Sequence, residues 1–192
     1  QDFEDATRGL IASDPALRVK ADDGRIIWDL PANAFIEGEA PDSVNPSLWR
    51  QAQLNNIHGL FEVAQGIYQL RGYDLSNMTL IEGETGWIVV DPLTARETAA
   101  AAFAFARRHL GDRPIRAMIF THSHIDHFGG VKGVIDAASI AEDNTRIIAS
   151  EGFMEHVVSE NVLAGNAMTR RVTYMFGGLI PVDEKGGVGV GL

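Results

Sequence analysis

The sequence predicts an α/β fold, and three patterns along the 192-residue chain support that prediction. Short apolar runs separated by Gly-containing turns are typical of an antiparallel meander, and they lie at 61–64, 67–70, 78–81 and 87–90. An Ala-rich helix is expected at 95–110, because Thr94 and Glu97 have the spacing of a capping box and Gly111 follows a basic last turn. Another apolar strand is expected at 116–120, so strands and helices combine in one domain-sized unit.

The composition is that of a folded protein, with 45% hydrophobic and 22% charged residues. This excludes a disordered chain, and the lack of an 18-residue apolar run argues against a membrane span. A net charge of −10 does not suit a non-specific nucleic-acid binder. The absence of Cys excludes disulfides, thiolate zinc sites and Cys nucleophiles. A metal site would therefore have to be built from His, Asp and Glu. The absence of Cys fits any cellular compartment, so the sequence does not assign one.

Two parts are expected along the chain. Residues 1–58 mix Asp, Pro, Ala, Gly and Glu, which favours an extended N-terminal arm with a little strand at 25–28 and a short helix near 47–56. Residues 59–192 carry the α/β pattern. Its later elements are a short helix beginning near 129–131, a strand at 145–149, a helix at 150–158 and a longer helix at 160–176 with one apolar side. Residues 186–192 hold four Gly and are interpreted as a loop cut in the middle.

Three of the six His lie within six positions, in a His-x-His-x-Asp-His pattern that directly follows the strand at 116–120. His122 and His124 are two residues apart, so in an extended segment both point the same way and can reach one cation. Asp126 and His127 come one turn later and face a second position. Imidazole with carboxylate suits Zn²⁺, and also Mn²⁺ or Fe. Two metals about 3.5–4 Å apart can lower the pKa of a shared water toward ~7 and so provide a hydroxide nucleophile.

This cluster and its flanks resemble the metallo-β-lactamase superfamily, whose fold opens with a meander and has a strand that ends in Asp shortly before a helix, as at 87–92. Segments 67–79, 90–94 and 160–171 are similar to the alkylsulfatases of that superfamily, which hydrolyse sulfate esters of long-chain alcohols such as dodecyl sulfate. The resemblance implies an αββα sandwich of which 59–192 is the N-terminal half. It also implies two zinc ions in the complete catalytic domain and a homodimer at full length.

The chain departs from the family in its number of ligands. The resemblance implies two Glu and one His well downstream of the cluster, yet only 65 residues follow His127. The only later His is His156, at a position where the family has no ligand. We therefore expect an N-terminal part that carries half of a metal site. Alone it should bind metal weakly, lack activity and expose an apolar face of its sheet.

The residues expected to bind metal are His122, His124, Asp126 and His127. Asp126 is also the expected catalytic residue. Asp91 and Thr121 are expected to orient the His loop through hydrogen bonds, a role that we favour over direct metal contact for Asp91.

Four further side chains are candidates for substrate contact: Tyr73, Asn77, Asn166 and Arg170. The first two flank Asp74 in a meander loop that could equally be a plain turn. The guanidinium of Arg170 suits sulfate because its donors reach two oxygens, but Arg170 and Arg171 would also fit a solvated helix face.

The function expected for the intact parent is metal-dependent hydrolysis of linear alkyl sulfate esters to sulfate and alcohol, that is, detergent degradation. Its partner is a small-molecule substrate, without nucleic acid. The alternatives are another ester, lactone or thioester hydrolase of the same fold, a nuclease that the net charge disfavours, or an inert chain with a structural role. Whether the C–O or the S–O bond is cleaved stays open.

Overall fold

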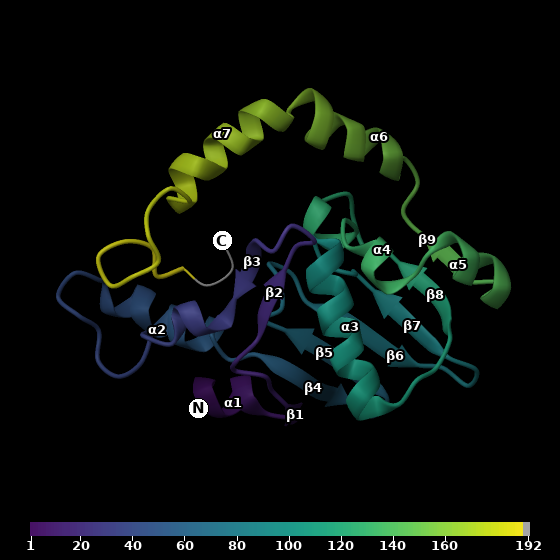
Figure 1. The fold of residues 1–192 in the computed structure, drawn as a ribbon, viewed down its shortest axis with the longest axis horizontal. Helices are drawn as coiled ribbons and strands as arrows, with labels where there is room; N and C mark the ends of the chain where they lie inside the picture. The colour runs from purple at the N-terminus through teal and green to yellow at the C-terminus, as the bar shows by residue number, and fades with distance from the viewer. Residues whose placement is uncertain (190–192) are drawn as a thin grey trace.

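A seven-stranded mixed sheet forms the centre of the protein in the computed structural model, which describes residues 1–189 (Figure 1). In spatial order its strands are β1 (Leu10–Ala12), β4 (Gly59–Ala64), β5 (Ile67–Arg71), β6 (Met78–Glu82), β7 (Trp87–Val90), β8 (Ile115–Ile119) and β9 (Arg146–Ile148). Strands β4 to β7 pair antiparallel, and β7, β8 and β9 pair parallel. The predicted meander and the strand after it are confirmed.

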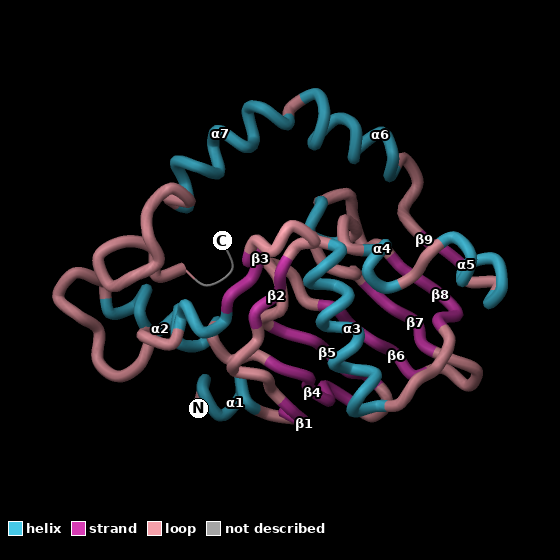
Figure 2. The backbone as a smooth tube through the Cα atoms, viewed as in Figure 1, coloured by secondary structure: helices cyan, strands magenta, loops and turns pink. Residues whose placement is uncertain are grey.

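Helix α3 (Arg96–Leu110) covers one face of the sheet and makes the crossover from β7 to β8 (Figures 1 and 2). Alternate strand residues point toward this helix, as the two-residue period of a strand requires, and those of β6 and β7 are buried at Met78, Leu80, Trp87 and Val89. They pack with Ala99, Ala102 and Phe103 of the helix in one core. The opposite face carries partly exposed side chains, which include Ile81 and Ile88.

The predicted helix at 95–110 is confirmed within a residue, but its predicted capping box is wrong. Helix α3 has no cap from Thr94, and its N-cap residue Ala95 makes no side-chain hydrogen bond to the helix. Instead, the carboxylate of Asp74 accepts hydrogen bonds from the backbone N–H groups of Thr94 and Ala95, both at 3.3 Å, and from the hydroxyls of Thr94 and Thr98. A carboxylate from the β5–β6 loop therefore accepts hydrogen bonds from the backbone N–H groups at the start of the helix.

The N-terminal 58 residues hold more regular structure than an extended arm. They contain α1 (Asp2–Thr7), β1, β2 (Arg18–Lys20), β3 (Ile26–Asp29), the short 3₁₀ helix Leu30–Asn33 and α2 (Pro46–Asn55). Strand β1 pairs with β4 and so joins the main sheet, whereas β2 and β3 form a separate two-stranded sheet. The pairing of β1 with β4 therefore connects the arm to the α/β part.

After β8 the chain forms α4 (Val131–Val134), α5 (Ala137–Asp143), β9, α6 (Phe153–Val158), a π-helical turn at Ser159–Leu163 and α7 (Gly165–Phe176). The single helix predicted at 160–176 is wrong, because the π turn interrupts it. Helices α6 and α7 form an arc that projects from the sheet (Figure 1). Residues 186–189 lie in a loop region, and the rest of the predicted C-terminal loop, 190–192, lies outside the described residues.

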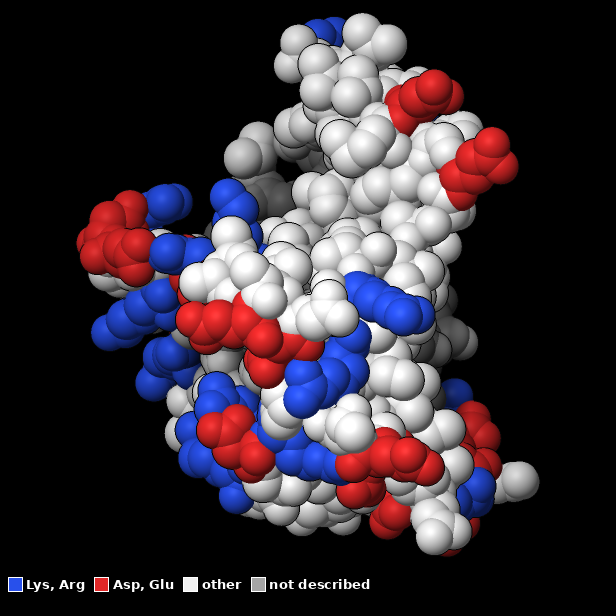
Figure 3. Space-filling model, turned by 90° about the vertical axis from the view of Figure 1, so that its right-hand side faces the viewer, with Lys and Arg blue, Asp and Glu red and all other residues white. Residues whose placement is uncertain are grey.

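The apolar side of α7 is not buried: every residue of this helix is at least partly exposed, and Met175 and Phe176 are exposed. Figure 3 shows charged side chains of both signs gathered on the lower part and the left edge of the face it presents, whereas the upper part is mostly uncharged apart from separate acidic groups and a basic group at the top. Within residues 1–189, no helix combines the length and the apolar character that a membrane crossing requires.

Candidate metal centre

The His cluster lies where parallel strands β7 and β8 end at the same edge of the sheet. Strand β8 runs into the loop that bears His122 and His124, and a 3₁₀ turn at Ile125–His127 follows. Strand β7 runs into Asp91, whose backbone N–H donates to the carbonyl of Ile119 at 3.0 Å. The carboxyl ends of neighbouring parallel strands therefore bring together residues that are 30 or more positions apart.

Asp91 has an unusual backbone conformation, with φ of 55°, and Leu93 nearby has φ of 66°. The left-handed region is unfavourable for residues with a Cβ, and such strain persists only where the surroundings enforce it. Here Asp91 is 8% exposed and its carboxylate is fully engaged. The sharp turn after β7 therefore directs this carboxylate at the His loop.

The three imidazoles of the cluster converge. The ring centroids of His122 and His124 are 4.6 Å apart, and those of His122 and His127 are 4.1 Å apart. The carboxylate of Asp126 lies beside them, with Oδ2 3.1 Å from Nε2 of His127. The hydroxyl of Ser76 donates to the backbone carbonyl of Asp126 and holds this turn from the β5–β6 loop. The structure thus brings together all four residues predicted to bind metal.

A chain of hydrogen bonds orients two of these rings. The backbone N–H of Thr121 donates to Asp91 Oδ1 at 2.9 Å, and its hydroxyl donates to Asp91 Oδ2 at 2.7 Å. Nδ1 of His127 lies 2.8 Å from the same Oδ2, so it must be the protonated nitrogen. The single hydrogen of the Thr121 hydroxyl is used in the hydrogen bond to Asp91. Thr121 Oγ1 therefore accepts a hydrogen bond from Nδ1 of His122 at 3.0 Å. In the neutral form, both rings then keep the lone pair on Nε2.

Glu160 is a site residue that the sequence analysis missed. Its Oε1 lies 3.1 Å from Nε2 of His124, and its Oε2 accepts from the hydroxyl of Ser123 at 3.3 Å. The segment 160–171 was singled out only for its likeness to the alkylsulfatases. No spacing rule could have found this contact, because Glu160 is 36 residues from His124 and reaches it from the π turn.

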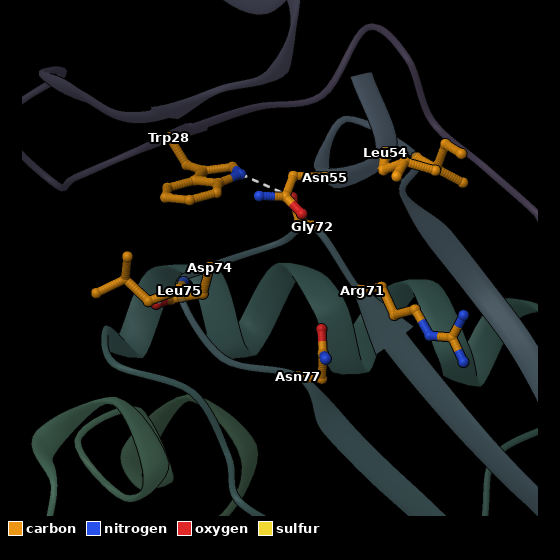
Figure 4. Close-up of a pocket in the computed structure, with 9 residues that line it drawn as sticks. Trp28, Leu54, Asn55, Arg71, Gly72, Asp74, Leu75 and Asn77 are labelled. Carbon is orange, nitrogen blue, oxygen red and sulfur yellow. Dashed lines mark hydrogen bonds between the residues drawn. The ribbon is translucent and has the colours of Figure 1, made fainter. Parts of the chain in front are cut away.

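The four candidate substrate residues fall into two places, the β5–β6 loop and helix α7. Tyr73 is fully buried and packs on Phe105 at 5.7 Å between ring centroids, so it supports the loop from the core. Asn77 lines a pocket of about 260 Å³ on the side of the arm, where Trp28 Nε1 donates to the carbonyl of Gly72 at 2.8 Å (Figure 4). Asn166 and Arg170 are exposed on α7.

A second cavity, of about 390 Å³, lies directly beside the cluster. Its lining is mostly apolar and combines the His loop with the π turn and α7: His124, Ile125, Asp126, Glu160, Asn161, Gly165, Met168, Thr169 and Val172. Asn166 and Arg170 are not among these residues. The cavity therefore places an apolar wall of α7 next to imidazole and carboxylate groups.

The chemistry of the donor set fits a divalent cation. Three imidazoles are surrounded by the carboxylates of Asp91, Asp126 and Glu160, whose ion-pair contacts within residues 1–189 are to His only. Such uncompensated negative charge attracts cations, and oxygen and nitrogen donors suit zinc and its neighbours. In the described part of the chain, however, no three donors surround a common point as a metal cage would require. The residues fit in type and proximity but form a partial site.

Comparison with known proteins identifies the class. The model of the metallo-beta-lactamase superfamily matches residues 71–191, and the chain belongs to that superfamily. A linear primary-alkylsulfatase of Pseudomonas sp. is 54% identical over 192 residues, which are 99% of this chain and 28% of that protein. Alkyl/aryl-sulfatase BDS1 of Saccharomyces cerevisiae is 50% identical over 193 residues, which are 100% of this chain and 30% of that protein.

The solved structure of the stereoselective inverting sec-alkylsulfatase Pisa1 from Pseudomonas sp. matches with a TM-score of 0.89 at 50% identity, over 96% of this chain and 29% of that one. The metallo-β-lactamase fold and the resemblance to alkylsulfatases are therefore confirmed. The chain spans less than a third of the length of each of these three relatives.

Proposed function

We propose that this chain carries part of a binuclear zinc site that hydrolyses linear alkyl sulfate esters to sulfate and alcohol. The observation that supports it most is the convergence of three oriented imidazoles in a chain that is 54% identical, over nearly its whole length, to a linear primary-alkylsulfatase. That likeness and the donor set support the proposed substrate class and the proposed pair of zinc ions.

His122 and His124 would hold one ion, and Asp126 and His127 the other. When bound, such a pair of ions supplies Lewis acidity and lowers the pKa of a shared water. Structural and catalytic zinc sites use three or four protein ligands for each ion, so two ligands leave each ion incompletely held. The complete site needs ligands besides these four, and a homodimer remains a prediction.

The residues of this chain orient the ligands and shape the space beside them. Asp91 accepts the proton of His127 Nδ1 and, through the hydroxyl of Thr121, fixes His122, so both rings present Nε2. The cavity next to Asp126 is walled by apolar side chains, which include Met168 and Val172. An apolar surface of this kind suits an alkyl chain whose polar end lies at the cluster.

A chimera tests this function. The matching segment of the Pseudomonas linear primary-alkylsulfatase is replaced by this chain, and release of sulfate from dodecyl sulfate is measured by ion chromatography with Zn²⁺ present. We expect turnover by the chimera and none by the 192-residue chain alone. His122→Ala should lower the rate at least about 100-fold, because it removes a metal ligand. His156→Ala, at an exposed position outside the cluster, is the matched control. A folded chimera that releases no sulfate would overturn the proposal.

A further inference from the structure

We propose that Glu160 is a positioning residue for His124: its carboxylate holds Nε2 of the ring and thereby turns Nδ1 toward the cluster as the metal-binding nitrogen. The contact itself stands on the geometry alone, whereas its use in metal binding rests on the proposed function.

The protonation of the ring follows from the acceptor. An ionised carboxylate only accepts hydrogen bonds, so Nε2 of His124, 3.1 Å from Glu160 Oε1, carries the proton. A neutral imidazole has one proton, and its lone pair is then on Nδ1. The second oxygen of Glu160 accepts from the hydroxyl of Ser123 at 3.3 Å. Both carboxylate oxygens are therefore engaged with the loop, which favours a supporting role over direct metal ligation.

Stability alone is a poor explanation for this contact. The side chains of His124 and Glu160 are 58% and 37% exposed, and ion pairs at exposed positions contribute little to folding. A carboxylate on the outer nitrogen of a metal-binding His, by contrast, is a common way to fix the orientation and the basicity of the ring. The partial exposure of the pair therefore fits orientation better than stabilisation.

The backbone that carries Glu160 is specialised. It lies in the π-helical turn Ser159–Leu163, where the N–H of Ala164 donates to the carbonyl of Ser159 at 3.0 Å, five residues back. Such wide turns are rare and occur often at functional sites. The sequence favours an uninterrupted helix through this segment, so the interruption coincides with the residue that reaches the His loop.

With this contact, all three rings follow one pattern. His127 Nδ1 is held by Asp91, His122 Nδ1 by Thr121 and His124 Nε2 by Glu160. Each ring thus has one nitrogen hydrogen-bonded to an orienting oxygen, and the other nitrogen is Nε2 in His122 and His127 and Nδ1 in His124. In His127 that Nε2 lies 3.1 Å from Oδ2 of Asp126, the other residue expected to bind the same ion. The partner of His124 is the only one of the three that comes from the arc of α6 and α7, so Glu160 also ties that arc to the site.

Nuclear magnetic resonance of the ¹⁵N-labelled 192-residue chain tests the assignment in two ways. Without metal, long-range ¹H–¹⁵N spectra at alkaline pH report which nitrogen of His124 is protonated. With ¹¹³Cd²⁺, the ¹¹³Cd–¹⁵N coupling reports which nitrogen binds, and a Zn²⁺ titration gives the dissociation constant. The variants are Glu160→Ala and Glu160→Gln, whose amide oxygen can still accept. Glu155→Ala is the control, because Glu155 is exposed and makes no side-chain hydrogen bond within residues 1–189.

We expect the wild-type ring to be protonated at Nε2 and to bind Cd²⁺ through Nδ1. In Glu160→Ala the ring should shift toward the tautomer mixture of a free imidazole, and the dissociation constant for Zn²⁺ should rise about 10–100-fold. Glu160→Gln should restore most of both properties, and the control should change neither.

Two results would overturn the proposal. One is a Glu160→Ala variant with the wild-type tautomer and the wild-type Zn²⁺ affinity. The other is equal loss of Zn²⁺ binding in the Ala and Gln variants with the tautomer unchanged, which would make Glu160 a metal ligand. The metal-free spectra decide the contact even if the chimera releases no sulfate, so failure of the proposed function is distinguishable from failure of this assignment.

Discussion

Asp74 is the residue on which the start of helix α3 depends, and we predict that Asp74→Ala destabilises the chain substantially. The carboxylate is 7% exposed and accepts from two backbone N–H groups at the helix start and from two hydroxyls, those of Thr94 and Thr98. Alanine would leave these donors in a largely buried place without that acceptor.

The magnitude follows from these contacts. Loss of an N-terminal cap costs about 1 kcal/mol. Hydrogen bonds to a charged acceptor contribute about 1.5–3 kcal/mol each, although Thr98 keeps an alternative acceptor in the carbonyl of Ala95 at 2.9 Å. Counting the cap and one hydroxyl, we expect a loss of about 2–4 kcal/mol in the free energy of unfolding. For a chain of this size that lowers the Tm by roughly 5–15 °C.

Guanidinium denaturation followed by tryptophan fluorescence measures the effect. Asp74→Asn should lie between the wild type and Asp74→Ala, because it keeps an acceptor and loses the charge. Asp42→Ala, at an exposed position, should change the free energy of unfolding by no more than about 0.5 kcal/mol. If Asp74→Ala matched Asp42→Ala, helix α3 would be capped by its own Thr94 and Glu97, and the reasoning from the β5–β6 loop would be refuted.

Three further substitutions test the core, each by thermal or chemical denaturation. Gly130→Ala should destabilise by about 2 kcal/mol or more, because an added Cβ would overlap neighbouring backbone oxygens, whereas Gly178→Ala has open space and should be near neutral. Met118→Ala removes a fully buried side chain and should cost about 2–5 kcal/mol, against almost nothing for Met154→Ala at a 67% exposed position. Burial raises the pKa of Tyr73 above its ordinary value of 10.0. The stability linked to the neutral phenol is therefore fully present below pH 10, and it is lost as the pH rises from there toward the pKa of the folded state. Tyr73→Phe should flatten that alkaline loss and cost nothing near pH 8, since the buried hydroxyl has no hydrogen-bond partner among the described residues. A steeper alkaline loss in Tyr73→Phe would contradict this reasoning.

The parts of the fold that sequence patterns predict well are those set by neighbouring residues. The meander follows from alternation over four or five residues and from Gly-containing turns, and helix α3 follows from its Ala content and its end at Gly111. Two features depend on distant contacts and were predicted wrongly. The cap of α3 comes from Asp74, about 20 residues before the helix, and the break before α7 lies at Glu160, whose partner is 36 residues earlier.

The same division runs through the site. His122, His124, Asp126 and His127 share one loop, so their spacing alone predicts that they meet. The place of Asp91 in the site was predictable only from the resemblance of the end of β7 to a known family. Its contact with His127 depends on the pairing of β7 with β8, which the spacing of the residues does not reveal. The contact of Glu160 had no signal in the sequence. It depends on a π turn, which local propensity does not reveal.

Orientation of the ligands and their number are separate properties of this site. The described residues complete the orientation, because Asp91, Thr121 and Glu160 each bind one nitrogen of an imidazole. They do not supply the full number of ligands, because each ion would have two protein ligands here, whereas zinc sites use three or four. Ligands that are already oriented lose little conformational freedom when an ion binds, so further ligands should add affinity with little ordering cost. Weak Zn²⁺ binding by the 192-residue chain would therefore be consistent with a well-ordered cluster. It is the chimera that tests the number of ligands, and the Glu160 variants that test their orientation.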